Sequence, residues 1–468
     1  MKKFDAVVIG AGMSGIACAL RLQSFGLNVA LIEKHRVIGG LNSFFQRVKK
    51  SSSGQRLGIR HFDVGLHALT NFAKKGSRNR PLMKILRQLR IPYDSLLLKE
   101  QNFSLIHLDN KKIKFDNNIE TFISEVEKFY PDQLSGFKKL VEVVQNSTLD
   151  TSKTEYVSSR EKIKEFISDE TLREMIFLPI FYYGSSWEDD IDFNQFCIMF
   201  QALYLEGFSR PYGGIRTLFN ILKEKMQSLN IVRMMGVGVQ KIEQHLDHHI
   251  LKLSNGETIS SKKVFSSIGY PETQRVLGKS VNKESIGKLG FVEVQIFYEK
   301  LLTEKLPTIC FYNKTDKFVY RNPETLIDTD SAIVCSPEGY EEFEGEEGVL
   351  RVTFLANYKL WKALDSEQYS KEKDKVEAIA RDLIQELYPS HDRQESFIDT
   401  FTPLTVEKYT SHMNGAIYGA TKKFLNGDIG IKDLFLIGTD QGYLGITGSI
   451  LSGISMANMY GFPTRQNP

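Results

Sequence analysis

The hydrophobic pattern of the first 33 residues predicts a strand, a helix and a second strand. Residues 6–9 form a continuous apolar run typical of a buried strand, and a stretch of small residues with helical character follows. A second apolar run ends at Glu33. Between the first strand and the helix stands a Gly-x-Gly-x-x-Gly motif, formed by Gly10, Gly12 and Gly15. This order of elements is typical of a dinucleotide-binding unit.

Each residue of this motif has a physical task in such a unit. Gly10 permits the tight turn, Gly12 lets the backbone approach a pyrophosphate, and Gly15 lets the helix pack closely on the strand. Together with Ser14, they direct the N–H groups of the helix N-terminus at the anion. Glu33 lies where a carboxylate that binds a ribose 2′-hydroxyl is expected. An ordinary glycine-rich turn is the alternative, but the strand, the helix, the second strand and the acid all occur in the order and at the spacing of a dinucleotide-binding unit.

The residues after Glu33 indicate which dinucleotide is bound. A carboxylate at this position also suits NAD, so the residues after Glu33 must distinguish FAD from NAD. A glycine pair follows directly, and residues 62–67 read FDVGLH. This order resembles the FAD-binding flavoprotein superfamily that includes amine oxidases and phytoene desaturases. The resemblance implies non-covalently bound FAD, with further cofactor contacts from Lys34, Gly39, Gly40, Leu41 and Asn42.

A second turn from strand to helix is predicted near the C-terminus. Residues 434–440 read as a buried strand that closes on Gly438 and Asp440, and Gly448 precedes a small-residue helix over residues 449–459. In a flavoprotein, Asp440 could hold ribityl hydroxyls, and the helix N-terminus could stabilise negative charge on the reduced isoalloxazine. Alone, the pattern suits a buried strand and a capped helix equally well. Its combination with the N-terminal unit favours the flavin.

The middle of the chain predicts a second domain and a return to the first. Residues 76–207 are rich in helical periodicity, and a segment with strands and an Asn-Gly hairpin turn follows Pro211. In the superfamily such a segment rejoins the first sheet, and Val239 would meet the adenine. Residues 283–423 are strand-rich, with a charged helix at 369–387.

We therefore expect an α/β protein with a Rossmann-like FAD-binding domain of the glutathione reductase type and a second, α+β substrate domain. The expected FAD domain is discontinuous, with residues 1–75, 208–282 and 424–468. The expected substrate domain comprises residues 76–207 and 283–423.

Length, net charge and cysteine spacing limit the classes of function that the sequence allows. A chain of 468 residues with 41% hydrophobic residues is long enough for two cores, and its net charge of only +3 gives no reason to expect nucleic acid. The four cysteines are scattered without metal-ligand spacing, which favours reduced thiols and no metal site. Because the first strand begins almost at once, we expect no signal peptide and a cytoplasmic protein. The uncharged residues 441–464 contain too many small and polar residues for a membrane span.

Four stretches resemble one branch of the superfamily more narrowly. They are residues 62–67, 403–409 (PLTVEKY), 415–419 (GAIYG) and 434–440. Together they resemble the phytoene desaturase, carotenoid isomerase and retinol saturase group. This resemblance implies hydride transfer to or from an apolar, unsaturated, isoprenoid-like substrate, by a desaturase or a saturase acting on CH–CH groups. The sequence departs from the group in a basic insert at 47–60, expected as a surface hairpin or loop, and in a polar stretch at 441–443.

Three side chains are candidates for the chemistry. The resemblance gives His67 as a residue that could supply a proton to the carbon opposite the hydride, although a lone histidine is more often structural. Tyr409 and Tyr418 are alternative proton donors or pocket walls. Glu407 is the nearby carboxylate, and a surface salt bridge explains it equally well.

Other functions share this fold and stay open. A flavin amine oxidase, a redox-neutral polyene isomerase and a prenyl-cargo binding protein of the GDP-dissociation-inhibitor type would all have the same architecture. Gly236 and Gly238 lack the third glycine of a second dinucleotide motif. Electrons must therefore be exchanged with a quinone, oxygen, a diffusible reductant or a partner protein.

A peripheral membrane contact is a further expectation. Between Pro81 and Pro92 the sequence predicts an amphipathic helix with basic residues on its flanks. It could rest on anionic lipid, on the inner face of a membrane, beside a substrate entrance. An ordinary surface helix packed on a core is the alternative. The apolar side of this helix consists of Leu82, Ile85, Leu86 and Leu89.

Overall fold

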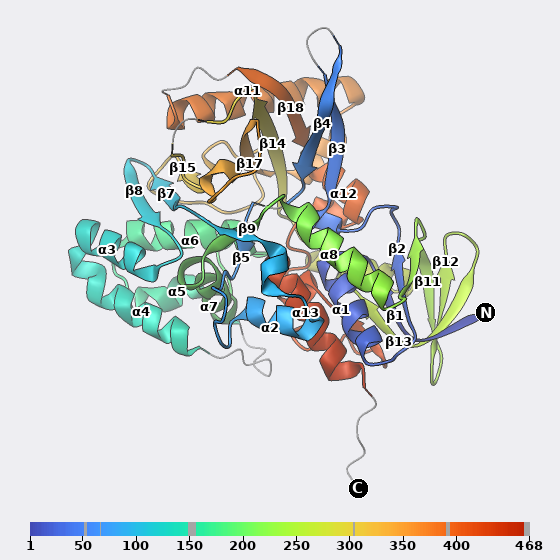
Figure 1. Cartoon of the computed structure of the whole chain (residues 1–468). Coiled ribbons are helices and arrows are strands. Elements are labelled where there is room, and N and C mark those ends of the chain that lie inside the picture. The colour runs from blue at the N-terminus through green and yellow to red at the C-terminus, as the bar shows by residue number, and fades with distance from the viewer. Residues whose placement is uncertain (51–53, 66, 148–155, 303–304, 390–393, 463–468) are drawn as a thin grey trace.

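The first of two large sheets contains the N-terminal unit. The computed structural model describes residues 1–50, 54–65, 67–147, 156–302, 305–389 and 394–462 (Figure 1). The first sheet has the strand order β10-β2-β1-β13-β12-β11, and β19 pairs with β13. Its strands are β1 (Lys2–Ile9), β2 (Val29–Glu33), β10 (Val232–Met235), β11 (Val239–Gln244), β12 (His249–Leu253), β13 (Thr258–Ser266) and β19 (Leu434–Leu436). Three distant parts of the sequence thus share one sheet.

Two helices made of small residues pack against each other beside this sheet. They are α1 (Met13–Ser24) and α13 (Gly445–Tyr460), which lie close together in Figure 1. A Cβ atom on Gly453 would overlap the backbone oxygen of Ser14, so glycine permits the close approach of the two helices. This contact, with the pairing of β19 and β13, ties the C-terminal segment to the N-terminal one.

The second sheet has the order β18-β14-β17-β16-β15-β7-β8. Its strands are β7 (Ser104–Leu108), β8 (Lys111–Phe115), β14 (Gly290–Tyr298), β15 (Ile309–Asn313), β16 (Ser331–Cys335), β17 (Gly348–Ala356) and β18 (Glu395–Phe401). Alternate residues of β14, Val292, Val294 and Ile296, share a core with the buried side of α11 (Ser366–Leu387). Helix α11 and the short α10 (Tyr358–Ala363) therefore cover one face of this sheet, as the charge pattern of residues 369–387 predicts.

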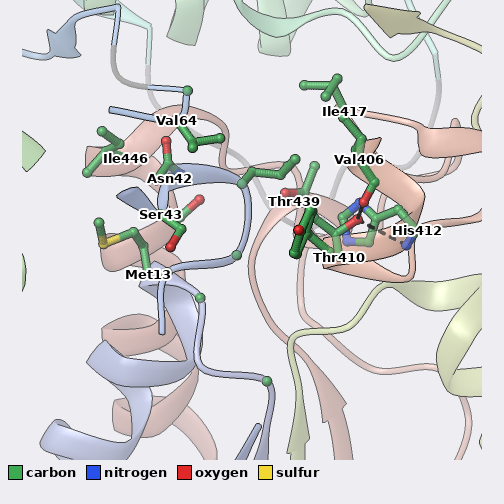
Figure 2. A pocket seen from close by; sticks show the side chains of 18 of the residues that line it. Met13, Asn42, Ser43, Val64, Val406, Thr410, His412, Ile417, Thr439 and Ile446 are labelled. Carbon is green, nitrogen blue, oxygen red and sulfur yellow. Dashed lines mark hydrogen bonds between the residues drawn. The ribbon is translucent and has the colours of Figure 1, made fainter. Parts of the chain in front are cut away.

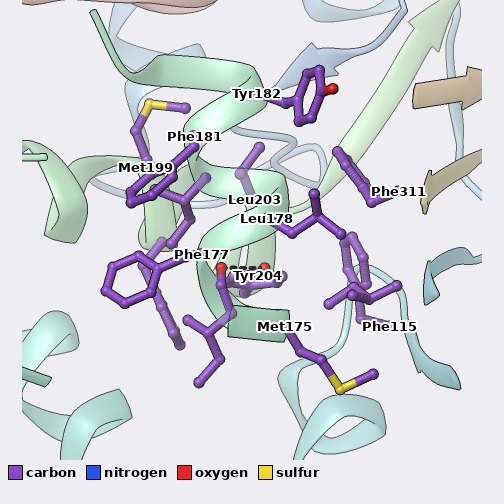
Figure 3. Close-up of a cluster of buried hydrophobic side chains, with 14 of the residues drawn as sticks. Phe115, Met175, Phe177, Leu178, Phe181, Tyr182, Met199, Leu203, Tyr204 and Phe311 are labelled. Atoms are coloured by element: carbon purple, nitrogen blue, oxygen red, sulfur yellow. Dashed lines mark hydrogen bonds between the residues drawn. The ribbon is translucent and has the colours of Figure 1, made fainter. Parts of the chain in front are cut away.

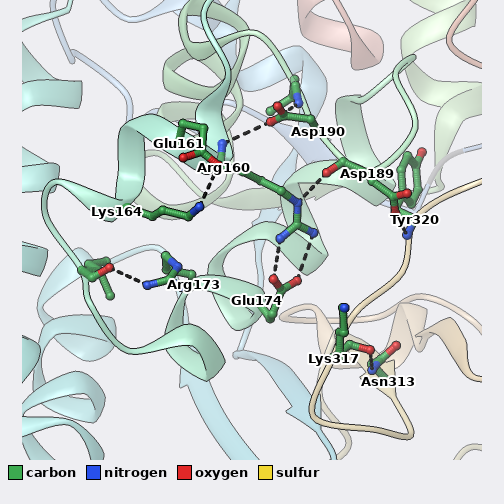
Figure 4. Close-up of polar contacts among 12 residues, drawn as sticks. Arg160, Glu161, Lys164, Arg173, Glu174, Asp189, Asp190, Asn313, Lys317 and Tyr320 are labelled. Atoms are coloured by element: carbon green, nitrogen blue, oxygen red, sulfur yellow. Dashed lines mark hydrogen bonds and ion pairs between the residues drawn. The ribbon is translucent and has the colours of Figure 1, made fainter.

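A group of helices covers the other face. It comprises α3 (Ile119–Phe129), α4 (Leu134–Asn146), α5 (Ser159–Lys164), α6 (Glu170–Gly184), α7 (Phe193–Phe200) and a short π-helical turn (Gln201–Leu205). Figure 3 shows the aromatic core to which Phe177, Tyr204 and Phe311 belong, with both strands and helices contributing. The Arg160 guanidinium pairs with the Glu174 carboxylate and links α5 to α6 (Figure 4).

Smaller elements join the two sheets. A three-stranded sheet has the order β5-β9-β6, and a separate hairpin pairs β3 with β4. Their bounds are β5 (Leu69–Thr70), β6 (Leu98–Glu100), β9 (Phe208–Pro211), β3 (Phe44–Lys50) and β4 (Arg56–Asp63). The remaining helices are α2 (Pro81–Leu89), α8 (Ile215–Ser228), α9 (Tyr270–Val276) and α12 (Pro403–Thr410). The β3–β4 hairpin matches the surface hairpin expected from the basic insert, apart from residues 51–53, which lie outside the described residues.

The predicted fold class, an α/β protein with a Rossmann-like domain, is confirmed by this architecture. The domain boundaries stay predictions, and helix α2 adds a difference. Its apolar side chains belong to the core of α1, α8 and α13, although the sequence analysis grouped them with the second domain. Leu86 is 4% exposed and Ile85 is 3% exposed. The proposed membrane role of this helix is therefore wrong, because its apolar side is buried in the protein. Among the described residues, no helix combines the length and apolar character needed to span a bilayer.

The burial of α2 leads to a stability prediction. Replacing Leu86 by alanine leaves a cavity between α2 and its neighbours, so Leu86→Ala should lower the free energy of unfolding by about 2–5 kcal/mol. The exposed neighbour provides the control, because Lys84→Ala should change the free energy by less than about 0.5 kcal/mol. Denaturant unfolding measures both variants. Equal stability of the Leu86 variant and the parent would contradict the packing of α2.

Candidate functional site

A cavity of about 1480 Å³ runs between the first sheet and the second. Its walls contain the glycine-rich loop at one end and aromatic side chains from α6 and β14 at the other. Figure 2 shows part of this wall, where Met13 and Asn42 face Thr439 and His412 across the space. Pockets for a single small ligand usually measure about 300–1,000 Å³. The cavity therefore has room for a dinucleotide together with a second molecule.

The three motif glycines have different surroundings. Gly10 has a φ of +94°, in the region that favours glycine, and a Cβ atom there would overlap the Ser267 hydroxyl. A Cβ atom on Gly15 would overlap the Gly10 carbonyl oxygen, so Gly15 lets α1 pack on the strand end. A Cβ atom on Gly12 meets no described atom within 4 Å, and Gly12 lines the cavity. Gly12 is thus the glycine whose absent side chain leaves space for a ligand.

The Glu33 carboxylate is fixed at the edge of the same loop. One of its oxygens accepts a hydrogen bond from the Ala11 N–H at 2.7 Å, and the other accepts one from the His35 N–H at 2.8 Å. A carboxylate has about four acceptor positions, so acceptor capacity remains for hydroxyl groups of a ligand. Next to it, the Gly39 N–H donates to the Ala11 carbonyl at 2.8 Å, which brings the glycine pair against the first loop.

Most of the predicted cofactor contacts lie along this end of the cavity. Those that line it are Gly10, Gly12, Ser14, Glu33, Lys34, Gly39, Gly40, Leu41, Asn42, Val239 and Gly448. Gly448 belongs to the first turn of α13, whose backbone from Leu444 to Ser449 also borders the cavity. The N-termini of α1 and α13 therefore open onto the same space, and both favour a ligand with negative charge.

Three predicted contacts lie outside the cavity lining, namely Gly15, Gly438 and Asp440. The Asp440 carboxylate is buried and accepts hydrogen bonds from the Tyr270 and Ala420 N–H groups at 2.5 and 2.7 Å. Burial lowers the pKa of the adjacent Lys423 to about 8, although Asp440 acts in the opposite direction. The contact of Asp440 with a ribityl chain stays a prediction, and in the structure its carboxylate holds these two backbone N–H groups. Because the chain turns at Gly438, with φ of +87°, Thr439 faces the cavity instead.

A buried group of charged side chains borders the cavity beside His67. The His67 Nε2 lies 2.6 Å from Glu293 Oε2, and the Arg351 guanidinium lies 2.6 Å from Glu293 Oε1. Glu293 and Arg351 are 2% and 3% exposed, on the adjacent strands β14 and β17. The Gln295 amide and the Thr353 hydroxyl also donate to Glu293, at 2.7 and 3.3 Å. Glu293 is thus held by four side chains.

The protonation states of this group follow from the contacts. The positive charge of Arg351 and the contact with His67 hold the pKa of Glu293 at about 2, although burial raises it. Burial, and then the charge of Arg351, lower the pKa of His67, with Glu293 acting in the opposite direction. His67 is therefore neutral at neutral pH, and an ionised Glu293 accepts the hydrogen from Nε2. Nδ1 is left as the acceptor nitrogen of a ring that lines the cavity.

The two candidate tyrosines have different surroundings. Tyr418 lines the cavity, and its buried hydroxyl donates to the Tyr182 carbonyl oxygen. Burial raises the pKa of Tyr418, which keeps its hydroxyl protonated and engaged with Tyr182. Tyr409 is 54% exposed and its ring lies 5.8 Å from the ring of His35, at the Glu33 end. Neither position suits a proton donor beside His67.

The half of the cavity beyond His67 is apolar and aromatic. Its lining includes Tyr182, Tyr183, Ile198, Met199, Phe291, Ile333 and Ile417. The buried hydroxyl of Tyr183 has no hydrogen-bond partner among the described residues, and the Tyr183 ring centroid lies 6.5 Å from that of His67. Sequence reasoning did not find Tyr183, Glu293 or Arg351. The aromatic cluster at 177–183 was the signal for Tyr183, and no local motif marks the other two.

A metal site requires several ligating side chains that lie close together. Within the described residues, no group of three or more histidine, cysteine, aspartate or glutamate side chains is arranged to hold a metal ion. The four cysteines are free thiols and are buried.

Comparisons of sequence support the nucleotide assignment. A family model described as an NAD(P)-binding Rossmann-like domain matches residues 8–89. Prolycopene isomerase 2, chloroplastic, from an Oncidium hybrid cultivar is 28% identical over 30% of this chain and 22% of its own length. The chain thus matches about a fifth of that relative. The all-trans-retinol 13,14-reductase of Danio rerio is 21% identical, over 97% of this chain and 85% of the relative.

Comparisons of structure define the fold. An oxidoreductase from Methanosarcina mazei has a TM-score of 0.64 at 16% identity, covering 97% of this chain and 100% of the other. Cyclohexylamine oxidase from Brevibacterium oxydans has a TM-score of 0.62 at 13% identity, covering 98% of each chain. The chain thus contains an NAD(P)-binding Rossmann-like domain at residues 8–89 and has the fold of this class of solved oxidoreductases. Within this class it is related to the group that contains the prolycopene isomerases and retinol reductases, which confirms the resemblance noted from the sequence.

The surroundings of Gly12 and Gly15 predict that substitution of one impairs dinucleotide binding and substitution of the other impairs stability. A valine at position 12 projects into the cavity, so Gly12→Val should fold normally and lose the bound dinucleotide. A valine at position 15 meets the Gly10 carbonyl, so Gly15→Val should lower the thermal unfolding midpoint. Extraction and chromatography of bound nucleotide, with thermal unfolding of each variant, separates the effects. Stoichiometric dinucleotide in the Gly12→Val variant would contradict the assignment of the glycine-rich loop as the pyrophosphate site.

The charged group predicts a pH-dependent stability. The pKa of Glu293 in the folded protein, about 2, lies below its ordinary value of 4.5. Glu293 therefore stabilises the fold above pH 4.5, and this contribution is lost as the pH falls towards 2. Glu293→Gln removes the carboxylate charge that faces the buried Arg351 guanidinium and should cost about 3–5 kcal/mol near neutral pH.

Denaturant unfolding over a range of pH measures this loss. The gap between the parent protein and the Glu293 variant should narrow as the pH falls below 4.5. The exposed Glu341 supplies the control, because Glu341→Gln should leave stability nearly unchanged at every pH. A gap that stays constant down to acid pH would show that the carboxylate is not ionised in the fold.

Proposed function

We propose that this protein is a FAD-dependent oxidoreductase that acts on CH–CH groups of an apolar, unsaturated, isoprenoid-like substrate. The observation that carries the proposal is the division of one cavity. Its first half holds the features of a dinucleotide site, and its second half is aromatic and apolar. The similarity to prolycopene isomerases and to a retinol reductase supports the same substrate class.

The residues present fit FAD. Gly12 leaves space for a pyrophosphate, the fixed Glu33 carboxylate can accept from ribose hydroxyls, and Val239 borders the far end of the cavity, where an adenine would lie. The first turn of α13, from Gly445 to Gly448, would stabilise negative charge on a reduced isoalloxazine, since a helix N-terminus favours negative charge. All these contacts are non-covalent. A bound flavin supplies the acceptance or release of hydride.

His67 supplies the proton chemistry in this proposal. The sequence analysis gave it as a proton donor, whereas the geometry favours the reverse. Its Nε2 hydrogen is engaged by Glu293, which leaves Nδ1 as the acceptor nitrogen of a neutral ring that lines the cavity. His67 therefore accepts a proton from the substrate carbon next to the one that loses hydride. This role favours desaturation, and Glu293 positions the ring by fixing its tautomer.

The aromatic half of the cavity has a separate task. Tyr182, Phe291 and Tyr418 exclude water and orient an extended apolar chain, with Tyr418 fixed through its hydroxyl. The electron acceptor that reoxidises the cofactor is not a second nucleotide in this proposal. It is a quinone, oxygen, or a diffusible or protein acceptor.

Anaerobic reduction by substrate tests the proposal. The FAD-loaded protein, mixed without oxygen with saturated or partly saturated isoprenoid chains, should lose its oxidised flavin absorbance while a double bond forms. His67→Gln should slow this step by about 10²–10⁴-fold with unchanged flavin content. The parent rate should fall in acid, because protonation removes the Nδ1 lone pair. His248, which lies between β11 and β12 and does not line the cavity, is the control, and His248→Gln should keep the parent rate.

Two outcomes would replace this proposal by another member of the fold. Reduction of the flavin by amines alone, with release of peroxide in air, would indicate an amine oxidase. Conversion of polyene isomers by the reduced protein, with no net consumption of electrons, would indicate an isomerase.

A further inference from the structure

The β3–β4 hairpin has two faces with opposite environments. Its strands extend past the neighbouring elements at the top of Figure 1. The register pairs Phe45 with Phe62, and Arg47 with Arg60, on one face. Because side chains alternate along a strand, Val48 and Ile59 pair on the opposite face. We call the face with Phe45, Arg47, Arg60 and Phe62 the inner face, and the face with Val48 and Ile59 the outer face.

The inner face fastens the hairpin to the second sheet. The rings of Phe45 and Phe62 stack with centroids 4.4 Å apart, and Phe62 meets Phe297 of β14 at 4.9 Å. The Arg60 guanidinium donates two hydrogen bonds to Glu347, at 2.6 and 2.9 Å. These contacts hold the hairpin in a fixed direction relative to the cavity.

The outer face exposes apolar side chains where a solvent-facing strand ordinarily carries polar ones. Val48, Leu57 and Ile59 are 49%, 57% and 46% exposed. Val48 lies directly opposite Ile59 on this face, and the exposed Leu57 stands next to them at a bulge in β4. An exposed group of this kind indicates an interaction surface rather than scattered surface hydrophobes.

The charge of the hairpin indicates the chemistry of its partner. Residues 44–63 contain five lysines and arginines and a single acid, Asp63, at the base. On the inner face, Arg47, Lys49 and Arg60 pair with only two acids, Asp399 of β18 and Glu347 before β17, and Arg56 is exposed next to Leu57, so the hairpin keeps a net positive charge. Apolar side chains surrounded by lysine and arginine are typical of a surface that rests on anionic lipid.

The cavity continues to the base of the same hairpin. Phe44, Phe45, Gln46 and Arg47 of β3 line it, together with Asp399 of β18. The side chain of Arg47 is 59% exposed and lies 3.8 Å from the Asp399 carboxylate, so the cavity wall reaches the surface there. A membrane that contacts the outer face would thus lie close to this end of the cavity.

We infer that the outer face of the β3–β4 hairpin docks the protein on an anionic lipid bilayer. Val48, Leu57 and Ile59 enter the boundary between headgroups and acyl chains, and the basic side chains contact the lipid phosphates and carboxylates. The docking depends on this surface alone. Its use, delivery of an apolar substrate to the cavity, rests on the function proposed above. The lipid contact is thereby moved from helix α2, where the sequence analysis put it, to the hairpin.

Vesicle sedimentation of the full chain tests the docking. The parent protein should sediment with vesicles of phosphatidylcholine containing about a third phosphatidylserine, and much less with phosphatidylcholine alone or at high salt. The variant Val48→Thr/Leu57→Thr/Ile59→Thr keeps β-branched side chains in the strands and removes the apolar surface. It should bind anionic vesicles about tenfold more weakly. A matched control, Val232→Thr/Leu246→Thr/Val319→Thr, removes three exposed apolar side chains elsewhere and should bind like the parent.

The outcomes separate docking from the other claims. Absence of binding by the parent, or equal binding by both triple variants, would overturn the inference. Dimers of the parent that the hairpin variant converts to monomers would also overturn it, because the face would then be an interface between two copies. FAD content and thermal unfolding are measured on the same samples. A variant that keeps both and loses vesicle binding supports the docking whether or not the proposed redox activity is found.

Discussion

The close approach of helix α1 to its neighbours is the constraint on which the rest of the structure depends. At Gly15 the helix touches the end of β1, and at Ser14 it touches Gly453 of α13. A side chain at either glycine would separate these elements. The first turns of α1 and α13 both border one cavity, to which segments more than 400 residues apart in the sequence contribute.

The second sheet adds a group that the nucleotide unit does not need. Glu293 and Arg351 are buried charges, which are costly to remove from water and contribute little net stability when paired. The contact of Glu293 with His67 gives this unfavourable burial of charge a role in the site. His67 arrives from the segment after the hairpin, whereas Glu293 and Arg351 come from β14 and β17. The ion pair thus fixes the tautomer of a histidine supplied by another part of the chain, at the border between the two halves of the cavity.

Local patterns made the nucleotide unit and the fold class predictable, because glycine geometry and strand periodicity act over a few residues. The Glu33 carboxylate and the glycine pair were found in this way. The predicted contact of Asp440 could not be read from such a pattern, because the chain turns at Gly438, with positive φ, and it is Thr439 that lines the cavity. Helix α2 was misread because an amphipathic pattern reports an apolar side but not what covers it. Glu293 lies 226 residues from His67, and only the tertiary structure brings them together.

The central claim is that the glycine-rich end of the cavity holds FAD. The most direct measurement is the visible absorption spectrum of the protein after incubation with excess FAD and removal of the unbound cofactor. The account predicts oxidised flavin bands that bleach with dithionite, and about one FAD released per chain on denaturation. A colourless, folded protein that takes up no FAD would contradict it and would favour a binding protein for prenyl cargo in its place.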